Sequence, residues 1–243
     1  MDSILIRERY KVIRVLEVRK NYVFAEAVDI LDRERSQYFL NIYEGAALKV
    51  YLPCFDSLRS CPDFLGMFLE EGSLVTVFKT CRGMPVDKVF CRGKPYGWKT
   101  RLEYAELLLQ EALKLADAMP EVSCAAMLSE NVLIDTDNGR VKLRFKVPPM
   151  EGMDERELVC LTVDQLNKIL LSDSETAIAQ LDFLEIASNG SCLNVVRLYG
   201  LWREWKDRIQ EEYEQLDKKN FISRRLSLLI GRVRRKAKQD RGE

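Results

Sequence analysis

The sequence predicts an α+β protein of two lobes, a small β-rich lobe followed by a mainly helical lobe. Alternating apolar residues, many of them β-branched or aromatic, dominate residues 1–80. Glycines and prolines gather in residues 81–99, which we interpret as a linker. From residue 100 onward, apolar residues recur at helical spacing. With 243 residues, 47% of them hydrophobic, the chain has enough apolar side chains for a buried core.

The first lobe is expected to contain five strands and one helix. The expected strands cover residues 10–18, 22–30 and 38–45, with two more on either side of Glu71-Gly72. Asn21 joins the first two strands as a hairpin. The helix falls within residues 46–61, where Pro53 should either occupy the first turn or break the helix.

The second lobe, residues 100–217, is expected to begin with a long helix capped by Thr100 and followed by Pro120. A second hairpin is predicted over residues 131–145, because Asp137, Asn138 and Gly139 form a turn sequence that tolerates positive φ. Two further helices are expected, over residues 155–171 and 192–219. The second of these begins a predominantly helical C-terminal region that continues into a basic helical tail, residues 218–243.

Composition excludes several kinds of catalytic chemistry. The chain contains no histidine, which excludes Ser-His-Asp and Cys-His hydrolysis and histidine-based zinc sites. Because histidine is absent, we expect no metal site. The seven cysteines are odd in number and include no Cys-x-x-Cys pair, so we expect reduced thiols and a cytoplasmic location. We also expect neither a transmembrane segment nor a signal peptide, since no apolar run is long enough.

The order of these elements resembles the two-lobed protein kinase fold, and several stretches resemble kinase motifs. Kinases carry a phosphate-binding loop with three glycines. The stretch LEVRKNYVFAEAVD, starting at Leu16, aligns with that loop without a gap. Glu17, Arg19 and Tyr22 stand where the three glycines would be. The resemblance therefore implies a loop whose backbone cannot come as close to a nucleotide, because each residue carries a Cβ.

Two kinase strands also align, and each lacks its functional residue. The lysine strand commonly reads YALKIY in kinases, and residues 38–43 read YFLNIY, which places Asn41 at the position of the lysine. The metal-binding aspartate of kinases lies within a stretch that commonly reads VKLIDFG. Here residues 141–147 read VKLRFKV, which places Phe145 at the position of the aspartate.

The catalytic loop carries the strongest resemblance. Kinases read HRDLKPENVLID, and residues 124–135 read CAAMLSENVLID, so that the last six positions are identical. Ala126 stands at the catalytic aspartate, while Asn131 is retained. We expect Asn131 to act structurally, with its amide bonded to the backbone of the loop. The resemblance covers about residues 9–170 and weakens beyond them, which predicts a truncated or atypical helical lobe.

These replacements imply a catalytically inactive kinase-like domain, a pseudokinase, without catalytic, metal-binding or cofactor-binding residues. Phosphoryl transfer depends on compensation of phosphate charge and on a base, and Asn41, Ala126 and Phe145 supply neither. The expected role is that of a protein-binding scaffold or regulator. One alternative is an atypical nucleotide-binding kinase, in which Arg19 or Lys20 faces phosphate and Asn131 holds metal together with Asp135 or Asp137.

A second alternative is a binding module formed by the C-terminal tail. Residues 218–243 contain ten Lys/Arg against two Asp/Glu, a net charge of +8, which leaves −8 on residues 1–217 of this neutral chain. Such a tail suits an anionic membrane, nucleic acid or an acidic protein. Trp202 and Trp205 are either a partner-binding face or a core stripe. The candidate interaction residues are Trp202, Trp205, Arg224, Arg225, Arg232, Arg234 and Arg235.

Overall fold

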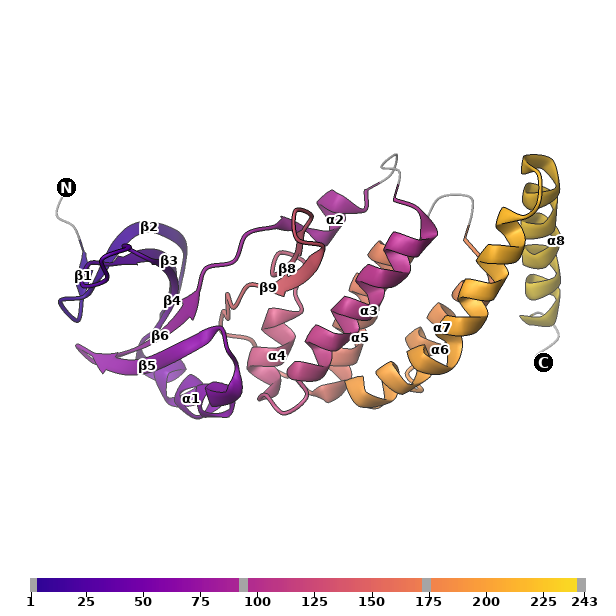
Figure 1. Ribbon diagram of the computed structural model, residues 1–243. Coiled ribbons are helices and arrows are strands. Elements are labelled where there is room, and N and C mark those ends of the chain that lie inside the picture. Colours follow the sequence, from indigo (N-terminus) through magenta and orange to yellow (C-terminus); the bar gives the residue numbers. More distant parts are fainter. Residues whose placement is uncertain (1–3, 92–95, 172–175, 240–243) are drawn as a thin grey trace.

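A computed structural model describes residues 4–91, 96–171 and 176–239 (Figure 1). A curled antiparallel sheet forms one lobe, and helices form most of the rest. The predicted two-lobed α+β fold is therefore confirmed. Residues 92–95 of the predicted linker and residues 240–243 of the predicted tail lie outside the described residues. No helix in the described part of the chain is both long and apolar enough to cross a membrane.

The small lobe is built on a six-stranded sheet in the order β1-β2-β3-β4-β6-β5. Its strands are β1 (Leu5–Ile6), β2 (Tyr10–Arg19), β3 (Tyr22–Asp29), β4 (Gln37–Tyr43), β5 (Phe64–Glu70) and β6 (Ser73–Lys79). Five of them lie where the sequence predicts strands, and β1 adds a short edge that was not expected. Asn21, with φ of 61°, and the Glu71-Gly72 pair, with φ of 47° and 81°, form the two tight turns.

One helix packs against this sheet, and it contains a proline at a place that the sequence did not predict. Helix α1 covers Gly45–Asp56 and tightens into a 3-10 turn over Ser57–Ser60. Pro53 lies inside α1, so the expectation that it would occupy the first turn or break the helix is wrong. Tyr51, Cys54 and Phe55 are buried on both sides of Pro53. Their packing holds a helical turn that proline alone disfavours.

A small second sheet, in the order β7-β8-β9, lies in the large lobe. It consists of β7 (Met84–Pro85), β8 (Val132–Asp135) and β9 (Arg140–Leu143). The predicted hairpin of β8 and β9 is present, and Gly139 closes its turn with φ of 61°. It brings the catalytic-loop motif before β8 close to the chain that follows β9.

The helices of the large lobe are α2 (Val86–Val89), α3 (Trp98–Lys114), α4 (Pro120–Ala126), α5 (Glu155–Leu170), α6 (Ile178–Ser188), α7 (Val195–Asp217) and α8 (Phe221–Gln239). The expected cap at Thr100 is wrong, because α3 begins at Trp98 and Thr100 therefore lies inside the helix. Trp98 stacks on Tyr213 with ring centroids 5.0 Å apart, and its indole N–H donates to Asp217. Contact with α7 thus fixes the start of α3. Helix α6 was not predicted, since its apolar residues show no clear single face.

The main hydrophobic core runs through both lobes without interruption. At the junction, the ring of Phe145 stacks on that of Phe78 at the end of β6, with centroids 4.8 Å apart. A smaller cluster on the other side of the large sheet includes Tyr10, Leu40 and Val77. The lobes are therefore joined by packed side chains as well as by the linker.

Candidate functional site at the junction of the lobes

Asn41, the residue at the predicted lysine position, lies in the middle of β4 and is fully buried. Its Nδ2 donates to the carbonyl oxygen of Phe145 over 2.9 Å. Its Oδ1 accepts from the hydroxyl of Tyr22 and from the backbone N–H of Val147, each over 2.9 Å. An amide is suited to this place because it both donates and accepts, whereas a lysine ammonium only donates.

Two tyrosines extend this attachment to the whole of segment 145–150. The hydroxyl of Tyr43, two residues after Asn41 on β4, donates to the carbonyl of Val147 over 2.6 Å. The hydroxyl of Tyr51 on α1 donates to the carbonyl of Pro148 over 3.3 Å and accepts from the N–H of Met150 over 2.9 Å. Burial raises the pKa of both tyrosines, so their hydroxyls stay protonated and able to donate. The segment is thus held against the small lobe.

A cluster of charges closes the edge of the same junction. The ammonium of Lys146 lies 2.8 Å from Glu17 on β2 and 2.5 Å from Glu130 in the catalytic-loop motif. Arg19 forms a further ion pair with Glu17. Burial alone would lower the pKa of Lys146, but its hydrogen bonds with Glu130 and Glu17 outweigh burial and raise that pKa. Arg19 and Lys146, the two cations of this cluster, therefore already have carboxylate partners.

Asn131 makes the backbone contacts of a structural amide. Its Nδ2 donates to the carbonyls of Ala125 and Lys146, over 2.7 and 2.8 Å. Its Oδ1 is buried and has no hydrogen-bond partner. This is the atom that a metal-coordinating asparagine presents to the ion. The side chain therefore joins the end of α4 to segment 145–150.

Two of the positions aligned with functional kinase residues offer no carboxylate at this junction. Ala126 is buried at the end of α4, and Phe145 is buried against Phe78, so neither position offers a carboxylate. Lys146 is engaged by two glutamates and is 13% exposed. In the residues that the structure describes, no three Cys, Asp or Glu side chains form a group able to hold a metal ion.

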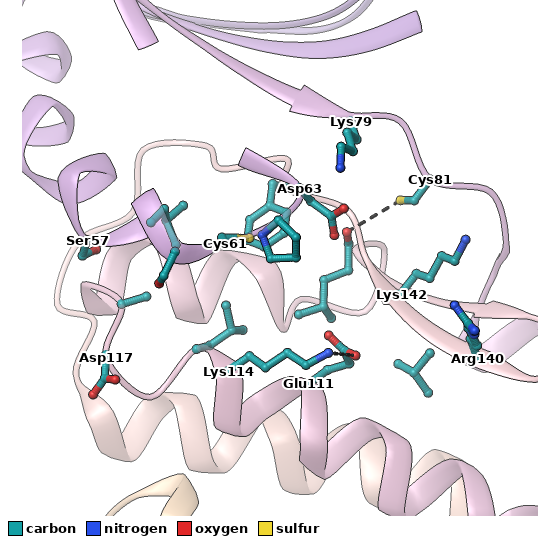
Figure 2. A pocket seen from close by; sticks show the side chains of 18 of the residues that line it. Ser57, Cys61, Asp63, Lys79, Cys81, Glu111, Lys114, Asp117, Arg140 and Lys142 are labelled. Carbon is teal, nitrogen blue, oxygen red and sulfur yellow. Dashed lines mark hydrogen bonds and ion pairs between the residues drawn. The ribbon is translucent and has the colours of Figure 1, made fainter. Parts of the chain in front are cut away.

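A cavity of about 680 Å³ lies elsewhere along the junction (Figure 2). It is bounded by the chain after α1, the end of β6, the last turns of α3 and strand β9. Its charged lining residues are Asp63, Lys79, Glu111, Lys114, Asp117, Arg140 and Lys142. Among the positions with a predicted kinase role, only Phe145 contributes to it. The mixture of both charge signs favours no single class of ligand.

The two tryptophans among the candidate interaction residues differ in their burial. Trp202 is fully buried, packs edge-on against Phe183 and donates to Glu106 over 2.6 Å. It is therefore part of the core and is not available to a partner, which corrects its place among the interaction residues. Trp205 is partly buried, and the guanidinium of Arg208 lies 4.9 Å from its ring centroid.

The arginines of the predicted tail also divide into two groups. Arg224 pairs with Asp217 over 3.0 Å, and Arg235 pairs with Asp182 over 2.7 Å and with Glu185. These two arginines bind the protein's own surface. Arg225 and Arg234 are exposed, whereas Arg232 is partly buried.

Sequence reasoning missed Tyr43, Tyr51 and Lys146. A signal existed for Tyr43, because residues two apart on a strand share one face and Asn41 was already singled out. Lys146 follows directly after Phe145, but its two glutamate partners are distant in sequence, at separations of 129 and 16 residues. Only the fold brings these residues together.

Comparisons with known proteins bear on the fold. No protein-family model and no curated protein matches the sequence. A solved structure of Rad53 in complex with AMP-PNP matches with a TM-score of 0.55 and 13% identity, over 81% of this chain and 65% of that chain. This chain thus spans slightly less than two thirds of that Rad53 chain.

Two other chains match over most of their length. A double mutant of the PknI kinase domain of Mycobacterium tuberculosis gives a TM-score of 0.54 at 12% identity, over 86% of this chain and 97% of that chain. The apo structure of a pseudokinase gives 0.57 at 12% identity, over 80% of this chain and 91% of that chain. Matches at identities this low show the fold alone. They show that the chain has a protein kinase-like fold.

Proposed function

We propose that this chain is a pseudokinase, a kinase-like domain that transfers no phosphate and acts by binding other proteins. One observation carries the proposal. Asn41, at the predicted lysine position, uses its amide to bind the backbone of Phe145 and Val147 across the junction. A side chain buried in these contacts is not free to pair with phosphate.

The charges beside it support the same function. Glu17, at the first predicted glycine position, brings a negative charge to the place where kinases bind phosphate. Arg19 and Lys146 both pair with Glu17, so the nearby cations neutralise the protein's own carboxylate. Binding of a nucleotide here would require these ion pairs to be exchanged for phosphate contacts at a desolvation cost.

Thermal-shift titration with ATP and magnesium tests the loss of nucleotide binding. We expect that adding ATP and magnesium leaves the melting temperature of the wild type unchanged. Each of the variants Asn131→Ala and Asn41→Lys, compared with the same variant without nucleotide, should also show no change on addition. A radiolabelled phosphate-transfer assay beside an active kinase should likewise give no incorporation. A shift in the wild type that disappears in Asn131→Ala would favour the atypical kinase, because that alternative holds metal through Asn131.

The scaffold role requires that partners be bound without nucleotide. Affinity capture with the full chain, in chelator and again in magnesium ATP, should recover the same proteins. Capture that depends on magnesium ATP would contradict the proposal. A deletion of residues 218–243 then tests whether the tail is the attachment element, which retention of all partners would exclude.

A further inference from the structure

Helix α8 carries an apolar stripe on its surface. Residues four, three and four positions apart lie on one face of a helix. The stripe consists of Ile222, Leu226, Leu229 and Val233, which are 77%, 56%, 59% and 68% exposed. Ile230, 44% exposed, borders it. Contiguous exposed aliphatic side chains of this kind mark an interaction surface.

The opposite face of α8 is the one that packs on the protein. Leu228 is buried, and a Cβ on Gly231 would lie 2.7 Å from Cγ1 of Ile178 on α6. Arg235 binds Asp182 and Glu185 on the same helix. Because α8 is anchored by these residues, the stripe faces away from the body. Figure 1 shows α8 at the end of the molecule opposite the large sheet, beyond α6 and α7.

Positive charge lies on both sides of the stripe. Successive residues are rotated by about 100° around a helix, which places Arg225 and Lys236 along one border of the stripe and Arg234 along the other. All three are exposed. Residues 218–239 contain nine Lys/Arg and no Asp or Glu. An apolar face bordered on both sides by cations is the pattern of a helix that lies in the plane of an anionic membrane.

Other occupants of the stripe use less of what α8 offers. The α8 of a second copy, packed symmetrically, would bring its own cations beside those of the first and be repelled. Nucleic acid would use the cations but not the exposed aliphatic side chains. A lipid surface uses both, because the aliphatic groups enter the acyl boundary while long basic side chains reach the headgroups.

We infer that α8 binds the surface of an anionic membrane, with the stripe Ile222–Leu226–Leu229–Val233 inserted and Arg225, Arg234 and Lys236 at the headgroups. This inference does not depend on the pseudokinase proposal. An active kinase could bind a membrane through such a helix, and a pseudokinase could act without binding any membrane. It assigns α8 the task of holding the two lobes at the membrane.

Vesicle flotation with the full chain tests the inference. The probes are vesicles of phosphatidylcholine alone and of phosphatidylcholine mixed equally with phosphatidylserine. We expect binding to the anionic vesicles only, and its loss at high salt. The Leu226→Gln/Leu229→Gln variant should bind at least roughly tenfold more weakly, because two side chains no longer insert. The Arg225→Gln/Lys236→Gln variant should also bind several-fold more weakly.

Matched controls lie on the small lobe, at positions of similar exposure. Leu69→Gln removes an exposed leucine, 61% exposed, and Lys11→Gln/Arg33→Gln removes two exposed cations. Both should bind as the wild type does. Circular dichroism confirms that each variant is folded, and the single change Ile222→Gln replaces the double variant if that one is not.

Three results would overturn the inference. The first is a folded wild type that floats with neither kind of vesicle. The second is binding that the charge variant loses and the leucine variant retains, which would indicate adsorption by charge alone, without insertion of the stripe. The third is a wild-type dimer, seen by light scattering, that becomes a monomer in the leucine variant, because a second copy would then cover the stripe.

Discussion

The side-chain oxygen of Asn41 lies 2.9 Å from the backbone nitrogen of Val147, although the two residues are 106 positions apart in the sequence. The contact joins the central strand of the small lobe to the chain that follows β9. Because the same amide also donates to Phe145, a single uncharged residue satisfies a backbone donor and a backbone acceptor in a buried place. The residue at the predicted lysine position therefore works as a link between lobes.

Replacing Asn41 by leucine should destabilise the protein by about 3 kcal/mol or more. Leucine fills a similar volume, so little of the loss comes from a cavity. The cost arises because the Tyr22 hydroxyl, the Phe145 carbonyl and the Val147 N–H each lose a buried partner. Urea unfolding of Asn41→Leu measures the change, and Asn189→Leu at an exposed position is the control. A loss no larger than the control's would show that the junction opens readily to water.

Tyr43→Phe should cost about 1 kcal/mol, since one buried carbonyl, that of Val147, loses its hydrogen bond while the aromatic packing stays. The ring itself stacks on Tyr51 with centroids 4.7 Å apart, and phenylalanine retains that contact. Tyr38→Phe, on the same strand but partly exposed, is the matched control and should change stability little. Equal unfolding free energies for the two variants would mean that the hydroxyl of Tyr43 contributes nothing.

Much of the small lobe could be predicted because its pattern is local. Alternation in β2, β3 and β4 and turn residues such as Asn21 specify strands without reference to the rest of the chain. The hairpin of β8 and β9 was predictable for the same reason. Pro53 and Thr100 could not be placed correctly, because tertiary contacts override local preference at both positions. Tyr51 and Phe55 are buried around Pro53. Trp98, two residues before Thr100, stacks on Tyr213.

The site was predictable as a set of motif positions but not as a set of contacts. Sequence motifs marked Asn41, Phe145 and Asn131, but gave no indication that the side chains of Asn41 and Asn131 bond to the backbone of segment 145–150. The sequence marked α8 only as part of a basic tail. Which of its residues face the body depends on contacts such as that of Gly231 with Ile178.

Stability should depend on pH through Glu106, which joins α3 to α7. Its carboxylate accepts hydrogen bonds from Tyr199, Trp202 and Lys206 over 2.8, 2.6 and 3.1 Å. Burial alone would raise the pKa of Glu106, but these three donors outweigh burial and hold that pKa below its ordinary value of 4.5. A lowered folded-state pKa means that the stabilisation is present above the ordinary value and is lost as pH falls through the folded-state pKa.

Glu106→Gln should therefore cost about 2 kcal/mol near neutral pH, and this cost should shrink as the pH falls below 4.5. Urea unfolding of the wild type and the variant at a series of pH values measures the difference between them. Glu103→Gln, an exposed residue on the same helix, is the control. A difference that stays constant across the series would show that charge on Glu106 is not what stabilises the contact.

Two helical glycines should respond to alanine with opposite signs. Alanine is favoured over glycine within a helix by about 1 kcal/mol, and Gly200 on α7 has no atom within 4 Å of the place where its Cβ would lie. Gly200→Ala should therefore stabilise the protein.

At Gly231 the new Cβ would lie 2.7 Å from Cγ1 of Ile178, a branch atom close to the backbone that cannot easily move aside. Gly231→Ala should push α8 away from α6 and loosen the ion pairs of Arg235. Limited proteolysis within residues 221–239, followed by mass spectrometry, should show faster cleavage in Gly231→Ala and unchanged cleavage in Gly200→Ala. Equal protection of α8 in both variants would contradict the close approach of the two helices.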